Sequence, residues 1–315
     1  MEAAGWRSTE FLLVRHGQTS WNAAGVIQGQ ADAPLDETGR SQAQALGAAA
    51  ASGALGAIRL PVLSSDLSRA ADTARALADH LRGAASTTPA APPPLVTLHP
   101  ELRERHVGVL QGVSRADAPA THRDAFRAFR SRDDDAARVP GGGESFDELW
   151  DRAVGFLERV AASEPASENP PARRRVLPSD GDEDASDAAS ADVAASKPTT
   201  RRVAVVTHGG VLRVFAARCA RDAGRKRRVL MTPPRGGCDG EESSDDPTIP
   251  GSNLSGGRRC VVRNCSVGVA RIYTPPRGSG EEPLWEATSW GEVGHLGALG
   301  VDALAHAFGG TEDTA

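Results

Sequence analysis

Two short apolar runs far apart in the chain end in the same dipeptide, His-Gly. They read FLLVRHG at residues 11–17 and VAVVTHG at residues 203–209. Continuous apolar runs of this length are typical of parallel strands that are covered on both faces. The residues that follow such strands gather at the carboxyl edge of the sheet, where α/β proteins bind their ligands. One histidine there could be structural. Two at equivalent strand ends, with Arg15 beside the first, favour a functional site built on His16 and His208.

Strand and helix patterns alternate along the rest of the chain. Further strands are predicted at residues 60–63, 95–98, 267–272 and 284–288. Helices are predicted at residues 36–51, 66–81, 118–132, 146–160 and 209–219. Asp36 is a plausible N-cap of the first helix and Gly53 a plausible stop. This alternation predicts an α/β fold, a three-layer αβα sandwich with a mostly parallel central sheet.

Three tracts differ from the rest in composition. Residues 83–94, 163–200 and 223–259 are rich in Ala, Ser, Pro, Gly and acidic residues and have little apolar surface to bury. Such composition predicts disordered insertions. The basic run at residues 225–228 is interpreted as a solvated loop rather than a localisation signal. The remainder has the size of one domain, so we expect residues 1–315 to form a single domain that carries these insertions.

Charge and composition exclude several classes of protein. The chain has 36 Lys and Arg against 41 Asp and Glu, a formal net charge of −5, which argues against a general nucleic-acid or membrane-surface binder. No window approaches the roughly 18 apolar residues of a membrane span, and residues 1–10 lack the apolar core of a signal peptide. The four cysteines have no CxxC spacing, which is typical of reduced thiols. We therefore expect a cytoplasmic protein that holds any anion in a local basic pocket.

A third strand end supplies more polar groups. The sequence SSDLSR at residues 64–69 brings Arg69 to the same edge of the predicted sheet. Two guanidiniums, two imidazoles and nearby helix N-termini suit an anion of the size of one phosphoryl group. The segment LRERHVG at residues 102–108 offers a carboxylate, although spacing alone does not choose between Glu101 and Glu104. No HxH or HExxH motif or paired-carboxylate cluster is present, so no metal site is expected.

Several motifs in order carry a family resemblance. They are RHGQTSWN at residues 15–22, SDLSRA at 65–70, RERHVGVLQG at 103–112, PGGGES at 140–145 and HGG at 208–210. Together they resemble the histidine phosphatase superfamily, in its phosphoglycerate mutase-like branch, and within it the plant and algal phosphoglycerate mutase-like proteins. The resemblance implies a phosphoglycerate mutase-like fold and an enzyme that needs neither cofactor nor metal.

The resemblance also implies roles for individual residues. His16 matches the nucleophile that becomes a phosphohistidine, and Glu104 matches the acid that protonates the leaving group and then activates water. The phosphate- or substrate-binding positions that it implies are Arg15, Gly17, Asn22, Gln28, Gly29, Arg69, Arg115, His208 and Gly209. The ligand would be a small phosphorylated metabolite.

The fate of the phosphohistidine leaves alternatives open. Transfer to water makes a phosphatase, and return to a bound sugar acid makes a phosphoglycerate mutase. The segment ERHVGVLQG resembles the mutases, although Val107 replaces their Tyr, Gly210 their usual Asn and Arg115 their substrate-binding Lys. The PGGGES element and residues 207–213 resemble the phosphatases, which we favour. A non-catalytic phospho-ligand binding module is a remote third alternative, because the five positions that the family's chemistry requires are all present: Arg15, His16, Arg69, Glu104 and His208.

Less is predicted of the substrate. Arg105 and Arg115 hint at a second anionic group on it, beyond the phosphate. The predicted helix at 118–132 is either a lid over the site or an amphipathic cap. The sequence predicts neither the identity of the substrate nor the oligomeric state.

Overall fold

The computed structural model describes residues 6–85, 95–131, 134–163, 202–225, 229–231 and 262–299. Its strands are β1 (Arg7–Arg15), β2 (Ile58–Ser64), β3 (Val96–Leu98), β4 (Arg202–Thr207), β5 (Val229–Met231), β6 (Val267–Thr274) and β7 (Leu284–Glu292). They form one seven-stranded sheet in the order β3-β2-β4-β1-β6-β7-β5. The two strands that carry the His-Gly ends are therefore neighbours in the middle of the sheet.

The sheet is mostly parallel, as predicted. Strands β3, β2, β4 and β1 run in one direction, and β5 runs parallel to β7. Among the strands of the described residues, only β6 is antiparallel to both of its neighbours, β1 and β7. In the pairing of β1 with β4, Phe11 lies opposite Val203 and Arg15 lies opposite Thr207. This register brings His16 and His208 to the same edge of the sheet.

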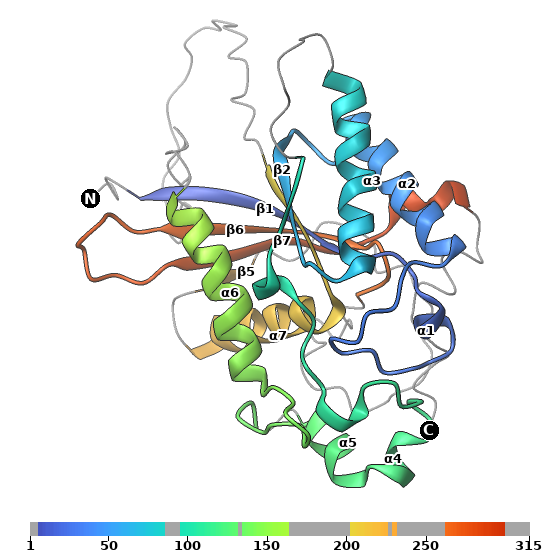
Figure 1. The fold of residues 1–315 in the computed structure, drawn as a ribbon. Helices are drawn as coiled ribbons and strands as arrows, with labels where there is room; N and C mark the ends of the chain where they lie inside the picture. The colour runs from blue at the N-terminus through green and yellow to red at the C-terminus, as the bar shows by residue number, and fades with distance from the viewer. Residues whose placement is uncertain are drawn as a thin grey trace, which may run out of the picture.

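Helices cover both faces of the sheet (Figure 1). They are α1 (Ser20–Ala23), α2 (Glu37–Ala51), α3 (Ser68–Ala85), α4 (Ala118–Thr121), α5 (Arg123–Arg130), α6 (Phe146–Ser163) and α7 (Gly209–Arg225), with 3₁₀ turns η1 (Pro100–Leu102), η2 (Gly108–Leu110) and η3 (Gly294–Leu299). Helices α2 and α3 pack on one face, and α6 and α7 pack on the other. The three-layer αβα architecture is confirmed.

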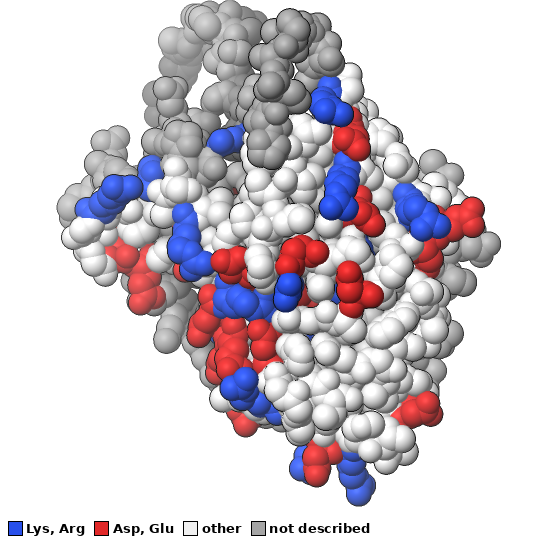
Figure 2. Space-filling view, in the orientation of Figure 1, with Lys and Arg blue, Asp and Glu red and all other residues white. Residues whose placement is uncertain are grey.

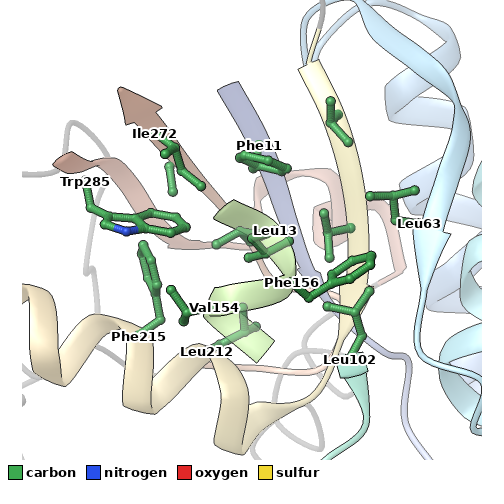
Figure 3. Packing of buried hydrophobic residues seen from close by; sticks show 14 of the residues in the cluster. Phe11, Leu13, Leu63, Leu102, Val154, Phe156, Leu212, Phe215, Ile272 and Trp285 are labelled. Atoms are coloured by element: carbon green, nitrogen blue, oxygen red, sulfur yellow. The ribbon is translucent and has the colours of Figure 1, made fainter. Parts of the chain in front are cut away.

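The central strand β1 contributes to a hydrophobic core on each face. Phe11 and Leu13 point toward α6 and α7, whereas Leu12 and Val14 point toward α2 and α3, as the alternation of side chains along a strand requires. The first core contains most of the buried aromatic rings, including Phe215 and Trp285 (Figure 3). The second is built from Ala, Val and Leu. The two faces of the sheet therefore differ in the kind of side chain that fills their cores.

Local signals explain where α2 begins. The Asp36 carboxylate accepts a hydrogen bond from the backbone N–H of Gly39 at 2.7 Å, so Asp36 is the N-cap that the sequence predicts. The helix ends at Ala51, two residues before Gly53, whose φ of +83° glycine adopts without strain.

Some predicted boundaries are wrong. Helix α3 begins at Ser68 and runs on to Ala85, so it includes the start of the tract at 83–94. The predicted helix over 118–132 is two helices, because the chain leaves helical geometry at His122, with φ −138° and ψ 50°.

Only short parts of the predicted insertions fall within the described residues, and those parts are helix or strand. The tract at 163–200 begins with the last residue of α6, and the rest of it lies outside the described residues. In the tract at 223–259, residues 223–225 belong to α7 and residues 229–231 form β5. The remainder of that tract and residues 86–94 also lie outside the described part of the chain.

The surface carries interspersed charges. On the face seen in Figure 2, basic and acidic side chains are interspersed, most densely beside α6. This face has no broad field of one sign that would attract a polyanion. None of the helices in the described residues is long and apolar enough to cross a membrane.

Candidate active site

The two histidines meet just beyond the ends of β1 and β4. The backbone N–H of His16 donates to the carbonyl of Thr207 at 3.0 Å, which extends the strand pairing by one residue. The imidazole centroids of His16 and His208 are 5.1 Å apart. The two residues are only 3% and 0% exposed. Their juxtaposition, predicted from two similar strand ends, is confirmed.

The His16 ring is held in one tautomer. Its Nδ1 lies 2.7 Å from the carbonyl oxygen of Gly17, which can only accept a hydrogen bond, so Nδ1 carries the proton. The lone pair is therefore on Nε2. Burial, followed by the charges of Arg69 and Arg15, holds the pKa of His16 well below its usual value. A buried neutral imidazole with a free Nε2 lone pair is suited to nucleophilic attack.

Gly17 fixes that geometry because no side chain fits there. A Cβ on Gly17 would lie 2.5 Å from the carbonyl oxygen of Gly39 at the start of α2. The backbone N–H of Gly17 donates to the hydroxyl of Thr73 at 3.0 Å. Gly17, predicted as a phosphate- or substrate-binding position, thus supports His16 through its backbone.

His208 is held through its Nε2, whereas His16 is held through its Nδ1. Its Nε2 lies 2.8 Å from the hydroxyl of Ser65, which itself accepts from the N–H of Leu67 at 3.3 Å. Its Nδ1 is buried and has no hydrogen-bond partner among the described residues. Burial, then the charges of Arg69, His16 and Arg15, holds the pKa of His208 well below its usual value. When Ser65 donates to Nε2, Nδ1 keeps its proton and is a donor available to a ligand.

Two arginines are buried beside these rings. Arg15 donates from Nη1 to the carbonyl of Val262 at 2.8 Å. Arg69, 1% exposed, donates to the carbonyls of Ala31 and Gly29, each at 2.8 Å. Burial lowers the pKa of Arg15 to about 9 and that of Arg69 to about 10, so both remain charged at neutral pH.

The arginines have unused donors. The Nε of Arg15 and the Nε of Arg69 are both buried without a partner among the described residues. Leaving a buried donor unpaired costs about 1–3 kcal/mol, more for a charged group. An anion held between the two guanidiniums would satisfy these donors.

The loop after the first motif supports Arg69. Gly29 has φ +53°, and a Cβ there would lie 2.6 Å from Cγ2 of Val107, so the position requires glycine. Its carbonyl is one of the acceptors that hold Arg69. Gln28 is buried, with its Oε1 3.2 Å from the hydroxyl of Thr19. Both predicted positions therefore lie at the site, and Gly29 acts through its backbone.

The Asn22 side chain is oriented by a residue that sequence reasoning missed. Its Oδ1 accepts from the N–H of Thr19 at 3.2 Å and from Nδ2 of Asn264 at 3.1 Å. With the oxygen engaged in this way, the amide Nδ2 is the group left to donate to a ligand. Asn264 lies in the segment that precedes β6, where no motif marked it.

Glu104 lies against the first turn of α7. Its Oε1 accepts from the N–H of Arg105 at 2.8 Å, and its Oε2 accepts from the N–H of Gly210 at 2.9 Å. Gly209, on the same turn, lies beside Arg15: a Cβ there would be 3.4 Å from Nε of that arginine. The negative charge of Glu104 raises the pKa of Arg15 and of Arg69 against the effect of burial. The structure therefore places Glu104 near both arginines. Spacing in the sequence alone did not choose between Glu104 and Glu101.

Arg115 and Arg105, which the sequence suggested for a second anionic group of the substrate, differ in exposure. Arg115 is exposed, with its guanidinium carbon 6.0 Å from the ring centre of Phe129, and its charge lowers the pKa of Arg15. Its charge therefore reaches the candidate site. Arg105 is 2% exposed and donates to backbone carbonyls, including that of Glu144 at 2.9 Å. The hint that Arg105 binds substrate is wrong, because its guanidinium is engaged in holding loops together.

The described residues contain no group of three or more His, Cys, Asp or Glu side chains that could hold a metal ion. The cations at this site are arginines.

Comparison with known proteins places the chain in context. A family model described as the histidine phosphatase superfamily (branch 1) matches residues 11–169. The metal-independent phosphoserine phosphatase of Arabidopsis thaliana is 38% identical over 212 residues, 67% of this chain and 68% of that protein. Phosphoglycerate mutase-like protein 4 of the same plant is 30% identical over 308 residues, 96% of this chain and 92% of that protein.

A solved structure supports the fold. The native structure of a mycobacterial glucosyl-3-phosphoglycerate phosphatase matches with a TM-score of 0.56 at 24% identity, covering 91% of this chain and 100% of that chain.

Proposed function

The chain belongs to the histidine phosphatase superfamily, branch 1, and from that premise we propose that it hydrolyses a small phosphorylated metabolite through a phosphohistidine intermediate. The observation that carries this proposal is the buried, neutral His16, whose Nδ1 is bonded to Gly17 and whose Nε2 is therefore free. The surrounding arginines with unpaired donors fit the phosphoryl group that it attacks.

In the first step, Nε2 of His16 attacks the phosphorus atom, and the bond from phosphorus to the ester oxygen breaks. The departing oxygen takes a proton from Glu104, which lies across the first turn of α7 from Arg15. Arg15, Arg69, the Nδ1–H of His208 and the amide of Asn22 donate to the phosphoryl oxygens as charge develops on them.

In the second step, water attacks the phosphohistidine. The Glu104 carboxylate, ionised after the first step, takes a proton from that water, and the bond from phosphorus to Nε2 breaks. Inorganic phosphate leaves, and His16 is again neutral. The proton given in the first step is thus recovered in the second.

A hydrolase is favoured over a mutase by the contact between Glu104 and Gly210. A Cβ on residue 210 would lie 2.1 Å from Oε1 of Glu104, so any side chain there would displace the carboxylate. The glycine lets the Glu104 carboxylate accept from the N–H at the start of α7, and this carboxylate is the base that the proposed hydrolysis of the phosphohistidine requires. The name of the Arabidopsis phosphoserine phosphatase relative agrees with this choice.

The substrate class is inferred from the rim of the site. Arg115 is an exposed cation whose charge reaches Arg15. A phosphorylated metabolite that carries a carboxylate, of which phosphoserine is one, suits such a cation beside the phosphate site.

The decisive experiment offers the purified protein phosphoserine, 3-phosphoglycerate and other metabolite phosphates, with phosphate release and 2-phosphoglycerate formation followed in parallel. We expect release without isomerisation, unchanged by EDTA. Isomerisation without release would make the chain a mutase. No turnover of any ester and no acid-labile phosphoryl label on His16 would favour the binding-module reading instead.

A further inference from the structure

Arg152, on α6, binds the backbone of the segment that carries Glu104. Its Nη1 donates to the carbonyl of Glu101 at 2.7 Å and to that of Arg103 at 3.0 Å. Its Nη2 donates to the carbonyl of Glu104 itself at 3.2 Å. Nη1 also donates to the carbonyl of Pro100 at 3.4 Å, so four carbonyls within five residues converge on one guanidinium, although no motif of the sequence singled out Arg152.

The other side of that guanidinium is bound by Glu144. The pair is bidentate: Nε donates to Oε1 at 2.9 Å and Nη2 donates to Oε2 at 2.8 Å. Oε2 of Glu144 also accepts from the N–H of His106 at 2.8 Å. Both side chains are about one-fifth exposed, at 21% and 18%. The planar fork of arginine suits this double contact and lysine does not.

We propose that Arg152 and Glu144 are positioning residues that hold Glu104 at the geometry required for proton transfer, an inference that rests on the proposed phosphatase function. The carboxylate of Glu104 is bonded to the N–H of Arg105 and of Gly210. Arg152 binds the carbonyl of Glu104, and Glu144 binds the N–H of His106. The two side chains therefore hold the backbone on both sides of Arg105, and with it the position of the Arg105 amide.

Small displacements at this point matter. A shift of about 1 Å away from productive geometry costs on the order of 100-fold in rate. Removing Arg152 would free four carbonyls and leave Glu144 without its cation. The backbone that positions the Glu104 carboxylate would then be less fixed. The hydrogen bonds that hold His16, Arg15 and Arg69 would remain.

This reasoning gives a signature that a purely structural role would not produce. Proton donation matters for an alkyl ester, whose leaving oxygen is strongly basic, and matters little for a nitrophenyl ester. Displacing Glu104 therefore lowers kcat/KM for phosphoserine more than for p-nitrophenyl phosphate. A loss of folded protein lowers both equally, so the ratio of the two is independent of how much protein has unfolded.

The test measures that ratio in wild type, Arg152→Gln, Arg152→Lys, Glu144→Gln and Glu104→Gln. The matched control is Arg138→Gln, which removes an arginine that binds Gly143 and Glu148 in the same region and makes no hydrogen bond or ion pair with residues 100–104. We expect the ratio to fall about 10- to 100-fold in Arg152→Gln, toward the value of Glu104→Gln, and to stay unchanged in the control. An unchanged ratio in Arg152→Gln, with wild type active on both esters, would overturn the proposal.

A readout without substrate separates this inference from the function on which it rests. Amide hydrogen exchange of Arg105 and Gly210 reports whether their N–H groups still bind the Glu104 carboxylate. Exchange at both should be faster in Arg152→Gln than in Arg138→Gln. Inactive wild type would contradict the phosphatase function alone, whereas unaltered exchange would contradict the positioning role alone.

Discussion

The ends of β1 and β4 have nearly the same sequence but opposite hydrogen bonding. His16 gives its Nδ1–H to the carbonyl of the next residue and leaves Nε2 free. His208 uses Nε2 to contact Ser65 and leaves Nδ1 without a partner among the described residues. The motif sets where each ring lies, at the carboxyl edge of the sheet. The neighbouring residue that binds the ring decides which nitrogen faces the ligand, and therefore which chemistry the ring can perform.

The largest expected effect is the difference in lost activity between substitution of His16, the nucleophile, and substitution of His208, a hydrogen-bond donor. His16→Ala should abolish phosphate release and acid-labile labelling, since loss of a nucleophile costs on the order of 10⁶-fold. His208→Ala should lower turnover about 10²- to 10³-fold, the usual cost of one lost donor to a developing charge. Turnover and labelling with a radioactive phosphate ester measure both. A labelled His16→Ala protein would assign the nucleophile to another residue.

The glycines that follow the two histidines make a matched pair. Gly17→Ala places a Cβ 2.5 Å from the backbone oxygen of Gly39, whereas Gly209→Ala meets Nε of Arg15 at 3.4 Å, an ordinary contact. We expect Gly17→Ala to lower the free energy of unfolding by about 1–3 kcal/mol and Gly209→Ala to change it little. Urea denaturation of both variants tests the difference. Equal stabilities would contradict the account of Gly17.

The two histidines should contribute in the same direction to the pH dependence of stability. Both have pKa values well below 6.5 in the folded protein, so as the pH falls below 6.5 the unfolded chain binds protons that the folded chain does not. The free energy of unfolding therefore falls with falling pH, by up to about 1.4 kcal/mol per pH unit for each such group. His16→Gln and His208→Gln should each weaken this dependence between pH 6.5 and 5, as measured by urea denaturation. A slope that neither variant changes would mean that neither ring is neutral in the fold.

The smallest effect concerns the residue that orients His208. Ser65→Ala removes the hydroxyl that binds Nε2, a contact that contributes about 1 kcal/mol. Turnover should fall by less than tenfold, and labelling of His16 should continue because its own partner is the Gly17 carbonyl. Ser64→Ala is a useful control, since the Ser64 hydroxyl bonds only to the carbonyl of Ser65 among the described residues. A loss as large as that of His208→Ala would mean that Ser65 acts on the ligand directly.

Much of the fold follows from local patterns. Apolar runs predicted β1 and β4, and Asp36 predicted the start of α2, because these signals depend on residues close together in the chain. The antiparallel β6 was not distinguished from the parallel strands, since an apolar run looks the same in either direction when both faces are buried.

The residues of the candidate site that could be predicted are those that belong to a sequence motif at the end of a strand. His16, Arg15 and Arg69 are of this kind. Asn264 and Arg152 were missed because their partners, Asn22 and the backbone of Glu104, lie far away in sequence. Arg105 was misjudged for the same reason: only the fold shows that backbone carbonyls surround its guanidinium.

The position of β1 in the sheet has a consequence for truncated forms of the protein. The family match ends at residue 169, yet both neighbours of β1, the strands β4 and β6, lie beyond residue 200. A fragment that stopped at residue 169 would contain His16 and Glu104 but would leave both sides of an apolar strand unpaired, and β4 would no longer join β1 to β2. Unpaired strand edges of this kind add to other chains. The first half, made alone, should therefore aggregate rather than work as a smaller enzyme.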